Sequence, residues 1–248
     1  LELRDVSKGF VKRFDLAAKL ANYLGANVKE EVVHAVDQVS VSIGHGEVVG
    51  LVGESGCGES TLGRIVGGVH QPSDGEVRYQ GEPMADMTGQ RAREDALSIQ
   101  MIFQDPMSSL NPRLRVFDIV SEAPLFHRVV DRNGLEDYVR EVMLRVGLDP
   151  EFMRRYPHQF SGGQRQRIGI ARALAVNPQF LVCDESVAAL DVSIQAQVLN
   201  LFMDLRAELS LTYLFISHDL SVVEHLSDRV VIMYLGRVVE IAATDALF

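Results

Sequence analysis

Short apolar runs alternate with longer amphipathic segments along this chain, an arrangement typical of α/β proteins. Residues 39–43 alternate between apolar and polar positions and predict a half-buried strand. Residues 47–52, 180–183 and 213–216 are largely apolar and predict buried strands, and polar residues follow each of them. Because open α/β sheets bind ligands at the carboxyl ends of their strands, we expect these polar residues to form a site.

Helical patterns separate the predicted strands. Residues 138–146 and 195–209 carry apolar side chains at helical spacing and predict amphipathic helices. Residues 16–31 contain a further short amphipathic helix, inserted between two N-terminal strands, and we expect it to pack as a lid on its own domain. Contact with a membrane surface or a partner protein is the alternative. Its apolar face consists of Leu16, Leu20, Tyr23 and Leu24.

The composition predicts an ordered globular protein with a substantial core, because 47% of the 248 residues are hydrophobic. A formal charge of −10 argues against a nucleic-acid surface. The two cysteines, Cys57 and Cys183, are too few for a disulfide framework, which suggests a reducing compartment. No run approaches the roughly 18 apolar residues of a membrane-spanning helix. The start does not resemble a signal peptide, and the missing initiator methionine predicts a fragment or trimmed chain.

A glycine-rich loop follows the predicted strand 47–52 and precedes a helical run that begins at Leu62. In such a loop, successive backbone N–H groups can point at phosphate oxygens, and the helix adds its positive N-terminal dipole. The hydroxyl of Ser60 stands where a Mg²⁺ ligand is needed. The residues that we expect to bind ATP are Gly53, Glu54, Ser55, Gly56, Cys57, Gly58, Glu59, Ser60 and Thr61.

Position 59 departs from the phosphate-loop pattern, which has lysine where this chain has glutamate. A lysine would contact the β- and γ-phosphates, whereas a carboxylate repels them. At about 4 Å and an effective dielectric constant of about 20, one unit-charge contact contributes on the order of 4 kcal/mol, so reversing its sign should cost several kcal/mol. The loop alone leaves open whether it is an impaired nucleotide site or a glycine turn without nucleotide.

Two acids follow the buried run 180–183. Asp184 is expected to reach a metal ion through water, and Glu185 to polarise the water that attacks the γ-phosphate. An Asp-Glu pair after a strand is also a common start of a helix, so this pair alone leaves both interpretations open.

A second glycine-rich segment comprises Ser161, Gly162, Gly163 and Gln164. Ser161 and Gln164 have the spacing of a capping box, which predicts the start of a helix. Two glycines in a first turn weaken a helix, but they allow a phosphate to approach the backbone N–H groups closely. We therefore interpret this segment as a second phosphate contact.

Taken in order, these motifs resemble those of ABC ATPases. Residues 161–164 resemble the signature motif of that family, and residues 101–106 resemble its Q-loop. Residues 189–191 resemble its D-loop, and residues 217–219 resemble its H-loop. The likeness covers residues 1–248 and implies a single ABC ATPase domain. The fold that it implies is α/β, with a RecA-like P-loop NTPase core, an antiparallel β subdomain and a helical subdomain at about residues 105–160.

The resemblance also assigns chemical roles to individual residues. Glu185, His218 and Gln104 would be catalytic, with His218 holding the γ-phosphate and Gln104 sensing it. Ser60, Gln104 and Asp184 would form the Mg²⁺ site. The cofactors expected from the resemblance are therefore ATP and Mg²⁺.

The resemblance further implies partners. ATP would lie between the phosphate loop of one subunit and the signature motif of another, identical or related, with Asp191 coupling the two sites. Phe10 would stack on adenine, with Phe14 as a competitor and core packing as the alternative for both.

The helical subdomain would dock integral membrane permeases, with residues 104–113 at its base, and a solute-binding protein would act indirectly. Nucleic acid is not expected, and the location would be peripheral, on the cytoplasmic side of the membrane.

Two segments narrow the resemblance. Residues 104–113 and 156–160 are similar to those of dipeptide and oligopeptide importer ATPases, which implies uptake of peptides or a related small solute. That family's C-terminal extension would be absent. Ser186 stands where the family usually has proline. Ala188 stands where its D-loop often has serine. The alternative to an active importer ATPase is a non-catalytic nucleotide-sensing or scaffold subunit that is paired with an active ATPase. The acidic net charge and the importer-like Q-loop disfavour an ABC ATPase of DNA repair or translation.

Overall fold

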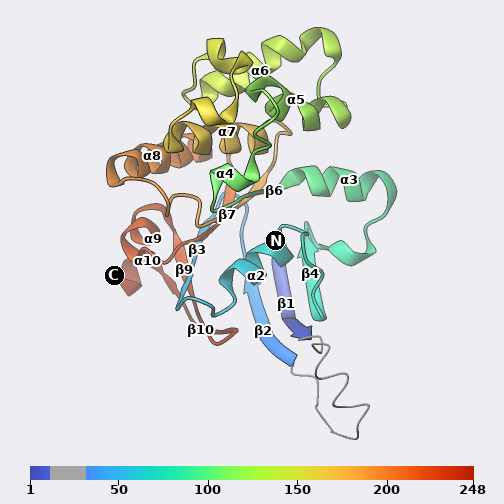
Figure 1. Cartoon of the computed structure of the whole chain (residues 1–248). Helices are drawn as coiled ribbons and strands as arrows, with labels where there is room; N and C mark the ends of the chain where they lie inside the picture. The colour runs from blue at the N-terminus through green and yellow to red at the C-terminus, as the bar shows by residue number, and fades with distance from the viewer. Residues whose placement is uncertain (12–31) are drawn as a thin grey trace, which may run out of the picture.

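The computed structural model of the protein describes residues 1–11 and 32–248. These residues form two β-sheets and a group of helices, with the helices α5, α6 and α7 gathered at one end of the molecule and the strands β1, β2 and β4 at the other (Figure 1). The predicted helix at residues 16–31 lies outside the described residues.

The larger sheet has six strands in the order β10-β9-β3-β8-β7-β6. All neighbouring pairs are parallel except β9 with β10, which is antiparallel. The strands β3, β7 and β8 are almost wholly buried because both faces of a parallel sheet are covered. The strands are β3 (Val48–Gly53), β6 (Ile99–Ile102), β7 (Phe180–Asp184), β8 (Thr212–Ile216), β9 (Arg229–Tyr234) and β10 (Arg237–Ala243).

The smaller sheet is antiparallel, with the order β2-β1-β4-β5. The short helix α2 (Glu59–Val66) packs against both sheets through one apolar cluster that also contains residues of β1, β2 and β3. The elements of this part are β1 (Glu2–Val11), β2 (Val32–Ser42), β4 (Asp74–Tyr79), β5 (Glu82–Pro83), the 3-10 helix η1 (Met84–Asp86) and α3 (Gly89–Ser98).

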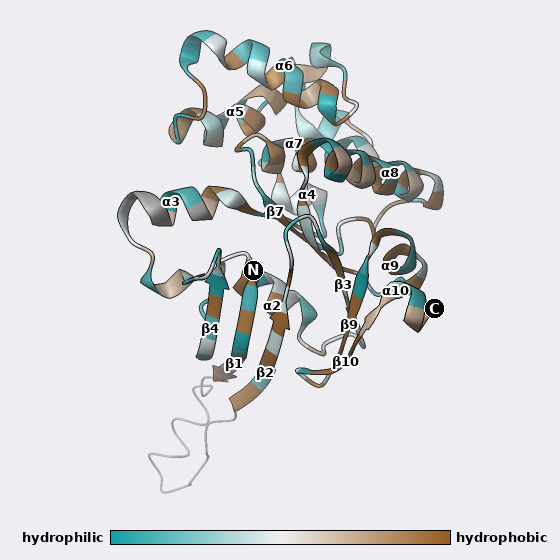
Figure 2. Cartoon of the chain, turned by 180° about the vertical axis from the view of Figure 1, so that it is seen from behind, coloured by the Kyte–Doolittle hydropathy of each residue, from teal (hydrophilic) through white to brown (hydrophobic). Residues whose placement is uncertain are grey.

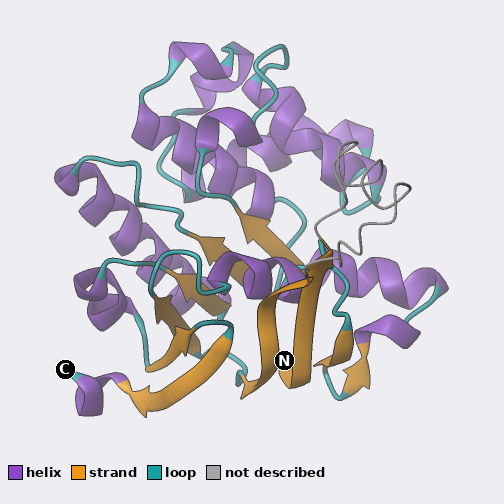
Figure 3. Ribbon diagram, turned by 60° about the horizontal axis from the view of Figure 1, so that its bottom comes forward, coloured by secondary structure: helices purple, strands orange, loops and turns teal. Residues whose placement is uncertain are grey.

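Helices account for most of the remaining chain (Figure 3). None of the helices in residues 1–11 and 32–248 is long and apolar enough to cross a membrane. The helices are α4 (Pro106–Ser109), α5 (Val116–Phe126), η2 (Arg132–Gly134), α6 (Leu135–Arg145), η3 (Pro150–Arg154), η4 (Pro157–Gln159), α7 (Gly162–Leu174), α8 (Val192–Leu209), α9 (Leu220–Leu226) and α10 (Thr244–Leu247).

Alternate residues of the central strands enter two different cores. Leu181 and Cys183 of β7 pack with residues of α5, α6, α7 and α8, whereas Phe180 and Val182 pack with α2 and the smaller sheet. Side chains of a strand point alternately to its two faces, so the sheet separates the two cores. Figure 2 shows the resulting pattern, with apolar colour on strands such as β7 and mixed colour on outer helices such as α6.

The predicted α/β fold class is confirmed, with a parallel core sheet, an antiparallel sheet and a helical part. The strand predicted at residues 39–43 coincides with the last part of the longer β2, which ends at Ser42. The alternation along β2 is interrupted near Gln38, whose φ of 51° is left-handed and coincides with an irregular register against β1. This irregularity hides the rest of the strand from a pattern of period two.

We predict that Phe202→Ala destabilises the protein by about 3–5 kcal/mol, because it removes a large side chain from a close-packed site. Phe202 is fully buried, and its ring makes edge-to-face contacts with Tyr213 and Phe215. Met203→Ala on the same helix is the control, since Met203 is 42% exposed and should cost about 1 kcal/mol or less. Denaturant unfolding measures both values, and equal losses would contradict this account of the core.

Candidate functional site

The nine residues that were expected to bind ATP run from the last residue of β3, through the loop 54–58, into the first turn of α2. Gly56 and Gly58 have left-handed φ values of 86° and 108°. A Cβ atom on Gly58 would lie 1.9 Å from the carbonyl oxygen of Ala35 in β2, so only glycine fits there. The α2 helix begins at Glu59, and its N-terminus has no side-chain cap. Backbone N–H groups at this end can therefore receive an anion.

The side chains of Ser60 and Asp184 are in direct contact at the carboxyl ends of the strands. Ser60 is in the first turn of α2, Asp184 ends β7, and the Ser60 Oγ donates a hydrogen bond of 2.8 Å to the Asp184 Oδ1. Burial raises the pKa of Asp184, and the hydrogen bond from Ser60 opposes this shift. A hydroxyl and a carboxylate in contact supply two of the oxygens that Mg²⁺ prefers. No three His, Cys, Asp or Glu side chains of the described ranges converge as a self-sufficient metal site, so Mg²⁺ would also need phosphate or water ligands.

Glu185 lies at the centre of a second contact group. The Gln104 Nε2 donates a short hydrogen bond to the Glu185 Oε2, and the His218 Nδ1 lies 3.3 Å from the Glu185 Oε1. Gln104 follows β6, Glu185 follows β7 and His218 follows β8, so neighbouring parallel strands deliver all three side chains to one edge. Glu185 itself has a left-handed φ of 47°, and its backbone N–H donates to the carbonyl of Ile216 at 3.0 Å.

Glu59 points into the loop rather than into solvent, and only 8% of its surface is exposed. Its Oε1 is buried and has no hydrogen-bond partner among the described residues. It lies beside Gly53, where a Cβ atom would be 2.8 Å away. Burial raises the pKa of Glu59 to about 7; a hydrogen bond with Cys57 lowers it, and the nearby Glu185 raises it. Burial and Glu59 likewise raise the pKa of the Cys57 thiol to about 11.

The segment 161–164 starts α7 with reciprocal capping hydrogen bonds, as its spacing predicts. The Gln164 N–H donates to the Ser161 Oγ at 3.3 Å, and the Ser161 N–H donates to the Gln164 Oε1 at 3.1 Å. A Cβ atom on Gly163 would lie 2.3 Å from the Cγ2 of Ile194, so this glycine allows α7 to pack on the start of α8. Asp191 is the residue that precedes α8, and it is exposed.

Phe10 is the last residue but one of β1, and the contacts of its ring do not connect it with the phosphate loop. Its ring packs edge-to-face on His70 with centroids 5.9 Å apart, and the Lys8 Nζ lies 5.5 Å from the ring centroid. His70 follows the C-terminal end of α2, whereas the phosphate loop precedes the N-terminal end. Adenine stacking on Phe10 therefore stays a prediction, and its competitor Phe14 lies outside the described residues.

Two contributors to the site escaped the sequence interpretation. The turn between β9 and β10 supports the phosphate loop, because the Gly236 N–H donates to the carbonyl of Cys57 at 2.8 Å. Leu235 and Gly236 both have left-handed φ values, and the Leu-Gly pair is a weak turn signal compared with Asn-Gly. Burial raises the pKa of Asp184, and Arg64 of α2 opposes this rise. Arg64 also lines a pocket of about 370 Å³ with Gln104 and Asp184.

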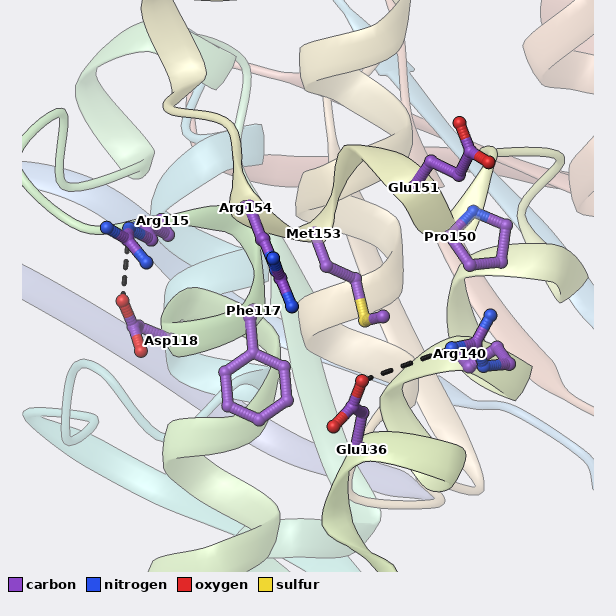
Figure 4. Close-up of a pocket in the computed structure, with 9 residues that line it drawn as sticks. All are labelled: Arg115, Phe117, Asp118, Glu136, Arg140, Pro150, Glu151, Met153 and Arg154. Atoms are coloured by element: carbon purple, nitrogen blue, oxygen red, sulfur yellow. Dashed lines mark hydrogen bonds and ion pairs between the residues drawn. The ribbon is translucent and has the colours of Figure 1, made fainter.

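A larger pocket of about 550 Å³ lies among α5, α6 and η3, away from the phosphate loop (Figure 4). None of the predicted site residues lines it. Its exposed charges are balanced, and its Arg140 and Glu136 form an ion pair at 4.0 Å. It therefore offers no concentrated charge for a phosphate group. The lining residues are Arg115, Phe117, Asp118, Glu136, Arg140, Pro150, Glu151, Met153 and Arg154.

Comparison with known proteins identifies the family to which this nucleotide-site geometry belongs. The family profile described as ABC transporter matches residues 36–188. The oligopeptide transport ATP-binding protein AppF of Bacillus subtilis is 49% identical over 100% of this chain and 73% of its own length. OppF of Salmonella typhimurium, an oligopeptide transport ATP-binding protein, is 50% identical over 88% of this chain and 66% of its own.

Among solved structures, the dimeric bacterial ABC transporter cassette MJ0796 superposes with a TM-score of 0.80 at 26% identity, covering 98% of each chain. The same cassette, solved in a dimeric post-hydrolysis state with ADP and phosphate, gives the same TM-score. The sheet order, the phosphate loop and the sequence relatives agree, and the chain belongs to the ABC transporter family as one of its ATPase domains.

Proposed function

We propose that this chain is the ATP-binding subunit of an importer that couples ATP binding and hydrolysis to the uptake of peptides or a related small solute. The contact of Glu185 with Gln104 and His218 carries the ATPase part of the proposal. The solute class is supported by relatives described as oligopeptide and dipeptide transport ATP-binding proteins.

In this proposal the residues divide the work of hydrolysis. Ser60, Gln104 and, through water, Asp184 would hold Mg²⁺, which would offset the charge of the β- and γ-phosphates. Glu185 would polarise the attacking water and accept its proton. His218 and Gln104 both contact Glu185, so they can orient the carboxylate and respond to the γ-phosphate.

The signature motif, the D-loop and the proposed partners belong to an assembly of several chains. Ser161 to Gln164 would contact the ATP of a second ABC ATPase subunit, and Asp191 would couple the two sites. The segment 104–113 and the neighbouring helices would contact permease subunits at the cytoplasmic side of the membrane, with a solute-binding protein acting indirectly. The dimeric cassette of similar fold supports the two-subunit part.

Glu59 should impair the phosphate loop of this chain. The loop keeps its shape, because its glycine conformations and its contacts with Ala35 and Gly236 do not involve the side chain of Glu59. The buried carboxyl replaces the lysine that would contact the β- and γ-phosphates, and its ionised form adds a negative charge beside them. ATP binding should be weak and hydrolysis very slow.

A second candidate is a non-catalytic subunit that senses nucleotide or acts as a scaffold beside an active ATPase. The buried carboxyl of Glu59, whose Oε1 has no hydrogen-bond partner among the described residues, favours it, because this group replaces the lysine of the phosphate loop. The intact contacts of Glu185 with Gln104 and His218 favour the first candidate. Nucleotide binding and ATPase assays of the chain beside its Glu59→Lys variant, each with a second subunit present, separate the two.

Glu59→Lys should tighten ATP binding at least about 100-fold and raise the turnover, because it replaces a repulsive contact by an attractive one. Glu59→Gln is the control, since it removes the charge without adding a cation and should recover only part of the affinity. Fluorescence titration with an ATP analogue measures the dissociation constants. A turnover of the unchanged chain at about 1 per second or faster, within the usual range of enzymes, would show that this account of Glu59 is wrong.

Glu185→Gln, introduced into the Glu59→Lys protein, should lower kcat at least about 100-fold, the usual contribution of a general base. ATP binding should change by no more than about threefold, because the proton acceptor acts only during the chemical step. Glu141→Gln is the matched control, since Glu141 lies on the surface of α6 and pairs only with Arg145 among described residues. Equal activity of the Glu185→Gln and Glu141→Gln proteins would remove Glu185 from the mechanism.

Glu59 should also make folding stability depend on pH in the protein free of nucleotide and metal. Its pKa rises from 4.5, the value for an unfolded chain, to about 7 in the fold. Ionisation is therefore disfavoured in the folded state, and stability is lost as pH rises from about 4.5 to about 7. Between pH 5 and pH 8 the stability of the unchanged chain should fall by about 2 kcal/mol relative to Glu59→Gln. Urea unfolding of both proteins at the two pH values tests this, and parallel pH profiles would contradict it.

A further inference from the structure

The turn between β9 and β10 contacts both the phosphate loop and the smaller sheet. The Gly236 N–H donates to the carbonyl of Cys57 at 2.8 Å, and the Asp37 N–H of β2 donates to the carbonyl of Gly236 at 2.8 Å. The Arg237 Nε donates to the Asp37 Oδ2 at 2.8 Å, so an ion pair joins the turn to β2 as well. In Figure 1 the strand β10 lies beside β2, although the two strands belong to different sheets. The turn therefore connects β2 with the phosphate loop.

The contact with Gly236 fixes the direction of one peptide unit of the phosphate loop. A trans peptide is planar, and its C=O and N–H groups point in opposite directions. Because the turn binds the carbonyl of Cys57, the N–H of Gly58 points away from the turn. This N–H has no hydrogen-bond partner among the described residues, so it is available to an anion.

This peptide unit needs support from outside the loop, because glycine allows it to rotate. Gly58 has a φ of 108°, and glycine can exchange this conformation for others with little steric cost. A rotated peptide would direct the carbonyl of Cys57 at the phosphate instead of the N–H of Gly58, and the partial negative charge of the carbonyl oxygen would repel it. The contact with Gly236 therefore decides which of the two groups the phosphate meets.

The turn does not favour its own conformation. Leu235 has a left-handed φ of 46°, which strains a residue with a Cβ atom. Its side chain is 73% exposed, so packing does not hold the turn in place. The ion pair is the side-chain contact that does, and within residues 1–11 and 32–248 the side chains of Asp37 and Arg237 have no other charged partner.

We infer that Asp37 and Arg237 are positioning residues for phosphate binding: their ion pair holds the turn, and the turn holds the Cys57–Gly58 peptide with its N–H toward the phosphate. Both side chains act through the backbone of Gly236 and need not touch the nucleotide. The inference rests on the proposed function, in which the phosphate loop binds ATP and Glu59→Lys restores its affinity.

Amide hydrogen exchange tests the link in the unchanged chain without nucleotide. Arg237→Ala removes the ion pair, and the Gly236 amide should then exchange about fivefold faster, because the turn opens more often. Asp37→Asn should have the same effect. Arg237→Lys should keep most of the protection, since both Arg237 nitrogens contact the same Asp37 oxygen and one cation can replace them. Unchanged exchange of the Gly236 amide in the Arg237→Ala protein would overturn the inference.

ATP binding tests the consequence in the Glu59→Lys background. Arg237→Ala and Asp37→Asn should each raise the Kd for ATP about three- to fivefold, because affinity falls with the fraction of loops in the competent conformation. The double variant should bind no more weakly than either single variant, since both changes remove the same pair. KM should rise by the same factor while kcat stays within about twofold, the pattern for a contact made equally in the ground and transition states. Fluorescence titration with an ATP analogue and steady-state assays measure these values.

Arg4→Ala is the matched control, because it removes an exposed ion pair with Glu2 in the same smaller sheet without touching the turn. It should change neither the exchange of the Gly236 amide nor the Kd. The inference fails if the Glu59→Lys protein binds ATP tightly and the added Arg237→Ala leaves its Kd unchanged. It also fails if Arg4→Ala weakens binding equally, or if Arg237→Lys binds as weakly as Arg237→Ala. A Glu59→Lys protein that binds ATP no better than the unchanged chain instead overturns the proposed function, while the Gly236 amide still reports on the turn.

Discussion

The parallel register of β3, β8 and β7 sets the position of the groups around the phosphate loop. Leu51 pairs with Ile216, and Ile216 pairs with Asp184, so these strands end at the same level. The loops that follow them begin side by side, which places Ser60 against Asp184 and His218 near Glu185. A shift of one residue would turn every side chain of a strand to the opposite face and separate these pairs.

Strand order explains why the sequence already indicated that the polar residues after these strands lie close together. The residues Asp184, Glu185 and His218 follow strongly apolar runs, and such runs become neighbouring parallel strands when helices cover both faces. The periphery was harder to predict. The support of Cys57 by Gly236 depends on a turn with a weak signal, and Phe10 depends on how β1 and β2 pair through several irregularities of register.

The sequence also could not give the electrostatic state of position 59. A glutamate taken from the sequence alone carries a full negative charge at neutral pH, and the repulsion of ATP is then estimated with that charge. In the fold, burial raises the pKa of Glu59 to about 7, so the carboxyl is only partly ionised near neutral pH. The direct repulsion is thus smaller than the sequence suggests, while the absence of the lysine's attraction is unchanged. Which of the two dominates depends on burial, and burial is a property of the three-dimensional structure.

The backbone of Glu185 has a consequence for how this chain could have changed over time. Its left-handed φ of 47° costs roughly 1 kcal/mol or more for a residue with a Cβ atom, and glycine or asparagine would adopt it more easily. Mutational drift in a chain that no longer needed the carboxylate would favour such replacements, because they would stabilise the fold. Position 185 nevertheless keeps its glutamate although position 59 has no lysine. Stability and the proposed hydrolysis therefore favour different residues at position 185, and the residue found there is the one that the proposed hydrolysis needs.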